Sequence, residues 1–308
     1  MDQATHLRQM IEIKSQNIIK QKTDRAVEAG LKAKVPRVIA VASGKGGVGK
    51  TNIVVNLAIA FRRIGNRVLI FDADLGLANI DIIFGLNPKC NIENMIKGEK
   101  ELSQVIVKGP EGVDIIPASS GVQELTQLTE GQKMNLLNEF DMLNRMYDLL
   151  LVDTGAGVSS NVIYFNLAAE ERMIVVTPEP TSVTDAYALI KILYFKYGIK
   201  NFYLLLNMVN DEKEAKSVYS KFSKVVDRFM GGISIDYAGF IPRDKFLVEA
   251  VSRRKPVMRA YPDAPSCKSF KLLADYLSKK EKTEQIDGNI KFFWKRLIGG
   301  ETDADNKR

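Results

Sequence analysis

A glycine-rich loop with two lysines is the part of this sequence with the clearest chemical consequence. Residues 44–51 have the spacing G-x-x-x-x-G-K-[ST], in which backbone N–H groups cradle nucleotide phosphates. Lys50 is placed to reach the β- and γ-phosphates, and the Thr51 hydroxyl to ligate Mg²⁺. Lys45 lies near the start of the loop, where its side chain cannot easily fold back onto the same phosphates. The residues predicted to contact the nucleotide here are Gly44, Lys45, Gly46, Gly47, Val48, Gly49, Lys50 and Thr51.

The segments on either side of this loop predict the strand and the helix that hold it. Residues 37–42 are an apolar run, R-V-I-A-V-A, which is typical of a short buried strand. Residues 52–64 place Ile53, Leu57 and Ala60 on one helical face. A helix that begins near Gly49 would point the positive end of its dipole at a bound phosphate.

Two acidic segments follow apolar strands and could complete a magnesium site. Residues 147–153 end in Asp153, which we expect to hold Mg²⁺ through water, because this ion keeps several of its waters. Asp72 and Asp74 end another strand. Two carboxylates this close repel each other unless a nearby cation or polar group stabilises them. Residues 154–157, T-G-A-G, predict a flexible turn that senses the γ-phosphate.

The loop and the acidic runs together resemble the MinD/ParA-type ATPases, whose deviant Walker A motif is K-G-G-x-G-K-T. The resemblance spans about residues 37–277. In that family the first lysine of the motif reaches the partner's nucleotide, so the resemblance implies that Lys45 acts in an ATP-bound homodimer. The run D-x-D-x-G-L-x-N-x-D resembles the family's switch I. It implies that Asp74 orients the attacking water and that Asp72 supports the Mg²⁺ site, with Lys45, Lys50 and Asp74 as the catalytic residues.

Residues at the ends of two later strands predict which nucleotide base the site recognises. Asn207 follows the strand predicted at residues 202–206, and an Asn amide can pair with the adenine N6/N7 edge. By the resemblance, Asn207 and the backbone around Pro242 cup the base, which implies ATP and ADP as ligands. The N-K-x-D-like element expected of a GTPase is absent from the sequence. The resemblance also directs Glu179 towards the partner's nucleotide, with a simple strand-ending loop as the equal alternative.

Strand-like and helix-like segments alternate from Arg37 onward, which predicts an α/β fold with a doubly wound, mostly parallel sheet. Further strands are predicted at residues 67–71, 113–116, 148–152, 173–176, 202–206 and 235–240. Further helices are predicted notably at residues 134–146, 183–197, 211–230 and 265–279. We expect residues 1–34 to form a helical extension, residues 35–280 the ATPase domain, and residues 281–308 a linker, a helix and a tail.

Composition narrows the class of protein. The chain has 308 residues, 45% of them hydrophobic, and a net charge of +7 that lies mainly at its two ends. The body between residues 37 and 279 holds 28 basic against 27 acidic residues, so we expect no specific nucleic-acid partner. Cys90 and Cys267 fit no disulfide or metal spacing and predict a reducing, cytosolic compartment. We expect neither a signal peptide nor a membrane span.

The C-terminal run predicts an amphipathic helix. Its apolar residues recur at the spacing of one helical face, and they are Ile290, Phe293, Trp294, Leu297 and Ile298. Basic residues flank this stripe, so we predict an interfacial helix that binds weakly alone and more strongly in a dimer. The protein would then be cytoplasmic and peripheral to the inner face of the cell membrane. The alternative is a last helix docked on the body.

The N-terminus carries the motif D-Q-A-x-x-L-R, with Asp2, Gln3 and Arg8. It resembles the FlhG family (also called YlxH or FleN), MinD-like regulators of flagellar number and placement. The resemblance implies that this segment stimulates an FlhF-type GTPase, with Gln3 orienting water in the partner's site, and that flagellar basal-body components are possible partners. The main alternative is a ParA-type DNA-partitioning ATPase, which should have a basic DNA-facing body. Iron–sulfur proteins of the same fold would need cysteine ligands that this sequence lacks.

Overall fold

The computed structural model describes residues 36–74, 79–117, 130–280 and 290–299. They form an eight-stranded sheet in the order β3-β4-β2-β5-β1-β6-β7-β8, parallel throughout except for the pairing of β3 with β4. The predicted doubly wound α/β fold is therefore confirmed. The strands are β1 (Arg37–Ser43), β2 (Val68–Ala73), β3 (Val107–Lys108), β4 (Asp114–Ile116), β5 (Leu149–Ala156), β6 (Glu171–Val176), β7 (Asn201–Val209) and β8 (Ser234–Pro242).

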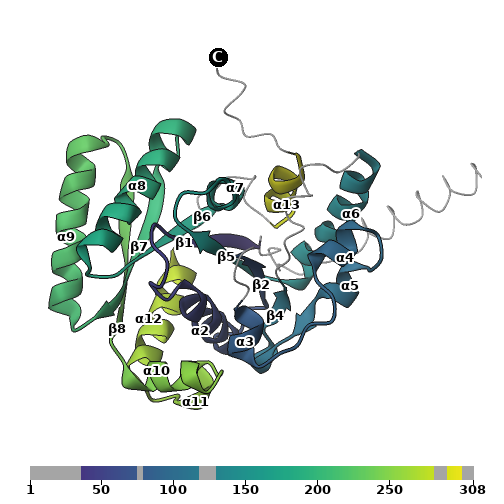
Figure 1. The fold of residues 1–308 in the computed structure, drawn as a ribbon, viewed down its shortest axis with the longest axis horizontal. Coiled ribbons are helices and arrows are strands. Elements are labelled where there is room, and N and C mark those ends of the chain that lie inside the picture. Colours follow the sequence, from purple (N-terminus) through teal and green to yellow (C-terminus); the bar gives the residue numbers. More distant parts are fainter. Residues whose placement is uncertain (1–35, 75–78, 118–129, 281–289, 300–308) are drawn as a thin grey trace, which may run out of the picture. The chain divides into compact units, whose positions relative to one another are not determined.

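Helices cover both faces of this sheet (Figure 1). Alternate residues of β1 feed two different cores, with Ile39 and Val41 on one face and Val38 and Ala40 on the other. The first face carries α2 (Lys50–Arg63), α3 (Ile80–Phe84), α10 (Lys245–Ser252), α11 (Val257–Ala260) and α12 (Pro265–Lys279). The second carries α6 (Glu130–Met146), α7 (Ser160–Ala168), α8 (Pro180–Tyr197), α9 (Glu212–Phe229) and α13 (Ile290–Gly299), with the short α4 (Ile92–Ile96) and α5 (Leu102–Val105) beside them. The 3₁₀ turn η1 (Pro110–Gly112) precedes β4.

Strand β5 is longer than the sequence predicts. It continues through Thr154 to Ala156, where a flexible turn was expected, so that expectation is wrong for these residues. Thr154 is buried and its hydroxyl donates to the carbonyl of Val41 at 3.0 Å, while Ala156 pairs with Ser43 of β1. The added ladder contacts with β1 hold this segment extended beside the glycine-rich loop.

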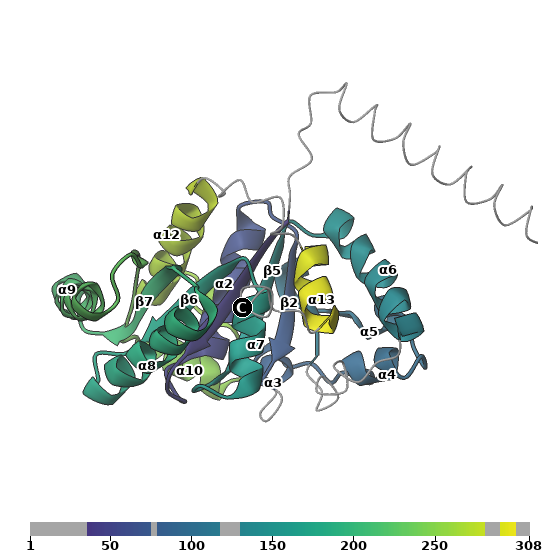
Figure 2. The ribbon, with the colours of Figure 1, turned by 90° about the horizontal axis from the view of Figure 1, so that it is seen from above.

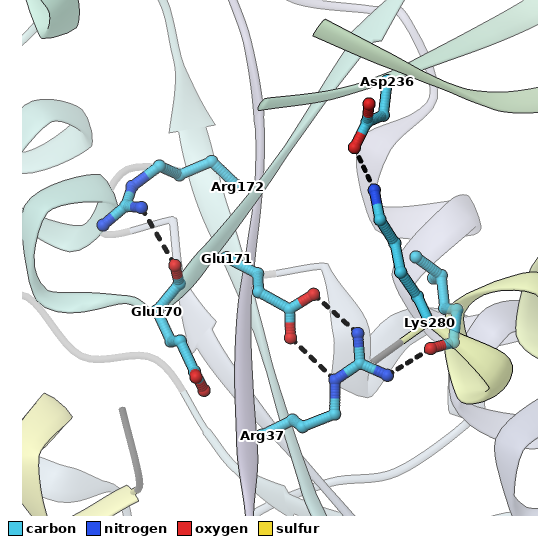
Figure 3. Close-up of polar contacts among 7 residues, drawn as sticks. Arg37, Glu170, Glu171, Arg172, Asp236 and Lys280 are labelled. Carbon is cyan, nitrogen blue, oxygen red and sulfur yellow. Dashed lines mark hydrogen bonds and ion pairs between the residues drawn. The ribbon is translucent and has the colours of Figure 1, made fainter. Parts of the chain in front are cut away.

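The amino-terminal edge of the sheet is held by ion pairs (Figure 3). Arg37 makes a two-pronged contact with Glu171 at 2.7 and 2.6 Å and also donates to the carbonyl of Leu277. Lys280 pairs with Asp236 of β8. These contacts join β1, β6, β8 and the end of α12, and they leave the opposite, carboxyl edge for a ligand.

Helix α13 fills a position in the second helix layer between α6 and α7 (Figure 2). The rings of Trp294 and Phe140 stack at a centroid distance of 3.7 Å, and Phe71 of β2 lies 5.0 Å from the same indole. Tyr164 of α7 donates a hydrogen bond to the carbonyl of Leu297. Five apolar residues of the helix are 0–1% exposed, namely Ile290, Phe293, Trp294, Leu297 and Ile298.

The residues expected to face a membrane therefore lie in the protein core. The alternative stated for the sequence, a last helix docked on the body, is the arrangement observed. The apolar stripe of the sequence does not distinguish a docked helix from a membrane-bound one, because both require one apolar helical face. No helix in the described ranges is long and apolar enough to cross a bilayer.

Candidate active site

The register of three parallel strands brings the predicted acidic residues beside the glycine-rich loop. Asp153 of β5 lies opposite Val41 of β1 on one side and opposite Asp72 of β2 on the other. The loop leaves β1 just beyond Val41, at the carboxyl edge where ligands bind in open α/β sheets. Loop and carboxylates are thus neighbours, as the strand-end positions predict.

Two glycines of the loop stand where any side chain would collide. A Cβ atom on Gly44 would lie 2.1 Å from the backbone carbonyl carbon of Asp185 in α8. Gly49 has φ +88° at the start of α2, and a Cβ atom there would lie 2.6 Å from the Asn207 amide nitrogen. The loop is therefore packed between α8 and the end of β7.

Lys50 is held inside the loop by a residue that the sequence analysis did not assign. The Lys50 ammonium group is buried and donates to the Ser43 hydroxyl at 3.0 Å, and that hydroxyl donates to the Lys45 carbonyl at 2.7 Å. Burial lowers the pKa of Lys50, and the charges of Asp153 and Asp74 oppose this shift. Ser43 directly precedes the G-x-x-x-x-G-K-[ST] motif, and its residue type alone gives no signal of this role.

The two buried carboxyl groups fit a divalent cation. Asp153 Oδ1 is buried and has no hydrogen-bond partner among the described residues, although Thr51 donates to the same carboxyl group. Burial raises the pKa of Asp72 to about 8, with the Asp153 charge adding to the shift. Burial likewise raises the pKa of Asp153 to about 7, against the opposing effects of Thr51 and Lys50. A Mg²⁺ ion would satisfy the orphaned oxygen and favour the charged forms of both groups.

Asp74 is half-buried and lies beside Asp72 and Gly155. A Cβ atom on Gly155 would lie 3.6 Å from Asp74 Oδ1, and the Asp74 backbone N–H donates to Asp72 Oδ1 at 3.3 Å. Asp74 therefore lies next to the end of β5 that carries Asp153. Its role towards water stays a prediction.

Asn207 contacts the loop itself. Its amide nitrogen donates to the Val48 carbonyl at 2.7 Å. The next residue, Met208, has φ +58° at an irregularity in the pairing of β7 with β8, and Arg243 donates to its carbonyl at 2.9 Å. Asn207 thus contacts the loop next to a positive-φ residue at an irregularity of β7. Adenine recognition by Asn207 and by Pro242, which ends β8, stays a prediction.

The two lysines of the loop point to different places. Lys50 donates to Ser43 within the loop and is attracted by the charges of Asp153 and Asp74. The Lys45 ammonium group instead donates to Glu179 Oε2 at 2.9 Å and to Thr181 Oγ1 at 3.0 Å. Both acceptors lie at the start of α8. Lys45 is therefore directed away from the phosphate position of its own loop.

Comparison with known proteins agrees with this geometry. The family model described as ParA, NUBPL iron-transfer P-loop NTPase, matches residues 34–278. The chain belongs to this ParA family of P-loop NTPases. Within the family, the antiactivator FleN of Pseudomonas aeruginosa is 42% identical over 262 residues, covering 85% of this chain and 93% of FleN.

A further relative and a solved structure are also similar to this chain. The flagellum site-determining protein YlxH of Helicobacter pylori is 35% identical over 268 residues, covering 85% of this chain and 90% of YlxH. The septum site-determining protein MinD of Pyrococcus horikoshii, solved in complex with Mg-ADP, shares the fold with a TM-score of 0.63 and 24% identity, covering 79% of this chain and 96% of that one. The resemblance to the FlhG (YlxH/FleN) group is thereby confirmed. The N-terminal residues Asp2, Gln3 and Arg8 lie outside the described ranges.

Proposed function

We propose that this ParA-family protein is a slow, Mg²⁺-dependent ATPase switch that dimerises with ATP, associates with the membrane and regulates flagellar number or placement. The observation that carries the proposal is the divergence of Lys45 and Lys50 from one loop. A loop that served only its own nucleotide would have no use for a second lysine directed outward.

The residues around the loop have complementary tasks in hydrolysis. Bound Mg²⁺ would supply positive charge to the β- and γ-phosphate oxygens. Thr51 and Asp153 would hold the ion, and Asp72 would support it from the neighbouring strand. Lys50 exchanges the Ser43 hydroxyl for a phosphate oxygen, because an anion is the stronger acceptor. Asp74, beside Gly155, orients the attacking water.

Dimerisation gives Lys45 its role. In the described state the Lys45 side chain is 38% exposed at the start of α8, where a second copy of the chain can present its nucleotide. Two sites that each need a lysine from the other subunit would tie assembly to ATP. Hydrolysis would then return the protein to monomers.

Membrane association would use α13 after its release. The apolar face of the helix is buried in the body, so it cannot bind lipid while docked. Trp294 Nε1 is buried without a hydrogen-bond partner in the described part of the chain, which makes the docked state less favourable. A released pair of such helices in a dimer would bind together. This supports a cytoplasmic protein that attaches reversibly to the inner face of the membrane.

The flagellar part of the proposal rests on the relatives. FleN is named as an antiactivator and YlxH as a flagellum site-determining protein, and both cover most of this chain. We propose that Gln3, with Asp2 and Arg8, stimulates an FlhF-type GTPase. Flagellar basal-body components would be further partners.

Sedimentation with liposomes and with DNA tests the proposal. Full-length protein is mixed with vesicles containing anionic lipid, or with duplex DNA at physiological salt, in the presence of ATP or ADP. We expect ATP-dependent binding to vesicles only, loss of that binding in Lys50→Ala, and no loss in Lys268→Ala on the exposed side of α12. ATP-dependent binding to DNA without binding to vesicles would replace the proposal with a DNA-partitioning function.

A further inference from the structure

The ammonium group of Lys45 has two acceptors within its own subunit. It lies 2.9 Å from Glu179 Oε2 and 3.0 Å from Thr181 Oγ1. The acceptors are 134 and 136 residues away in the sequence, so the contact depends on the packing of α8 against the loop. Two acceptors on one ammonium group fix its direction better than one ion pair does.

The start of α8 is a rigid platform for these two acceptors. Glu179 directly precedes the helix and Pro180 is its first residue, which restricts the backbone there. The Ser182 hydroxyl accepts a hydrogen bond from the Thr177 backbone N–H at 3.0 Å. Gly44 packs directly on the backbone of Asp185, one turn further along. The acceptors are therefore fixed relative to the loop that carries Lys45.

The contact is nevertheless suited to exchange. The side chains of Lys45 and Glu179 are 38% and 53% exposed, and water competes well for pairs of this kind. The hydrogen bond from Lys45 and its charge lower the pKa of Glu179, and Arg243 contributes in the same direction. Glu179 is thus ionised at neutral pH, and Thr181 adds a neutral acceptor that keeps the lysine in place.

We infer that Glu179 and Thr181 are positioning residues for Lys45, which hold its ammonium group within its own subunit until the nucleotide of a second copy replaces them as acceptor. Only the second part of this inference, the replacement by the partner's nucleotide, rests on the proposed ATP-dependent dimer. Polyphosphate oxygens carry more negative charge than one exposed carboxylate, so the exchange favours the dimer when ATP is bound. Both subunits of the dimer surrender the same two contacts, so the effect of removing one acceptor by mutation enters the dimerisation constant twice.

Acetylation of Lys45 tests the first half without nucleotide. Full-length protein is treated with a limiting amount of an acetyl N-hydroxysuccinimide ester, and the modified loop peptide is quantified by mass spectrometry. An amine held by two acceptors reacts slowly, so Thr181→Val and Glu179→Gln should each raise the rate about threefold, the size expected of one exposed contact. Thr184→Val is the matched control, because the Thr184 hydroxyl donates to the Pro180 carbonyl and not to Lys45. Unchanged rates in both variants would overturn the inference.

Dimerisation with ATP tests the second half. Analytical ultracentrifugation of Thr181→Val should show a dimer dissociation constant about tenfold lower than that of the wild type, because two contacts no longer have to break. Thr184→Val should leave the constant unchanged. A constant for Thr181→Val equal to or above that of the wild type would overturn the positioning role. Faster acetylation together with no ATP-dependent dimer in any variant would keep the local contact and overturn the proposed function instead.

Discussion

Trp294 lies flat on Phe140, with the ring planes within 2° of parallel. The same indole contacts Phe71, which directly precedes Asp72 in β2. The C-terminal helix therefore touches the strand that carries a carboxylate of the candidate magnesium site. A displacement of β2 during nucleotide binding would reach Trp294 through one side chain.

Replacing this indole tests whether α13 belongs to the folded body in solution. We expect Trp294→Ala to lower the free energy of unfolding by about 3 kcal/mol, because removing the large ring creates a cavity in a closely packed core. Chemical denaturation in the absence of nucleotide measures the change. Lys295→Ala, at the exposed neighbouring position, should change the value by less than about 0.5 kcal/mol. Equal stability of the two variants would mean that α13 is undocked in solution.

The buried carboxylates predict an unusual dependence of stability on pH. The folded pKa values of Asp72 and Asp153, about 8 and about 7, lie above the ordinary value of about 4. The native state therefore binds more protons than the unfolded chain, and this part of the stability is lost as pH rises from about 4 through 8.

Asp153→Asn should remove much of that loss. In protein free of Mg²⁺ and nucleotide, we expect the variant to melt several degrees above the wild type at pH 8 and close to it at pH 4. Asp263→Asn, at an exposed position, is the control and should follow the wild type at both values. Thermal unfolding followed by circular dichroism gives the comparison, and parallel curves for all three proteins would contradict the raised pKa values.

Alanine substitutions at two glycines of the loop should differ strongly in their cost in stability. Gly44→Ala would place a methyl group 2.1 Å from the backbone of α8, whereas the nearest atom to a Cβ on Gly46 is 3.9 Å away. Without nucleotide, we expect Gly44→Ala to cost about 3 kcal/mol of stability and Gly46→Ala to cost less than about 1 kcal/mol. Denaturation midpoints check this order, and similar midpoints would show that the loop can move away from α8.

Residues at strand ends were predictable because parallel strands share one carboxyl edge. Asp72, Asp153 and Asn207 each follow an apolar run, and the sheet order brings them to the glycine-rich loop. The spacing of glycines and lysines along the chain was sufficient to predict the glycine-rich loop itself. These are local signals, and they identify most of the candidate site.

Contacts between distant segments were not predictable from one sequence. The family resemblance directs Lys45 and Glu179 towards the partner's nucleotide, not towards each other, and no motif indicates Thr181. Their contact depends on how α8 packs. The extension of β5 through Thr154 likewise depends on pairing with β1. For α13, the apolar stripe was identified correctly, but its environment depends on the gap between α6 and α7, which a pattern in ten residues cannot encode.

Asn207 has two possible roles, support of the loop and recognition of adenine, and the affinities for two nucleotides distinguish them. The structure shows it donating to the Val48 carbonyl, and the family resemblance assigns it to adenine. We expect Asn207→Ala to weaken binding of a non-hydrolysable GTP analogue about tenfold, through loss of the loop contact, and the matching ATP analogue by a further factor of about ten. Asn201→Ala, at the exposed start of β7, should alter neither affinity. Isothermal titration calorimetry provides both constants for each protein. Equal weakening of the two analogues would leave Asn207 as a support of the loop alone, and unchanged affinities would contradict both roles, because a buried amide that contacts Val48 could then be removed without consequence.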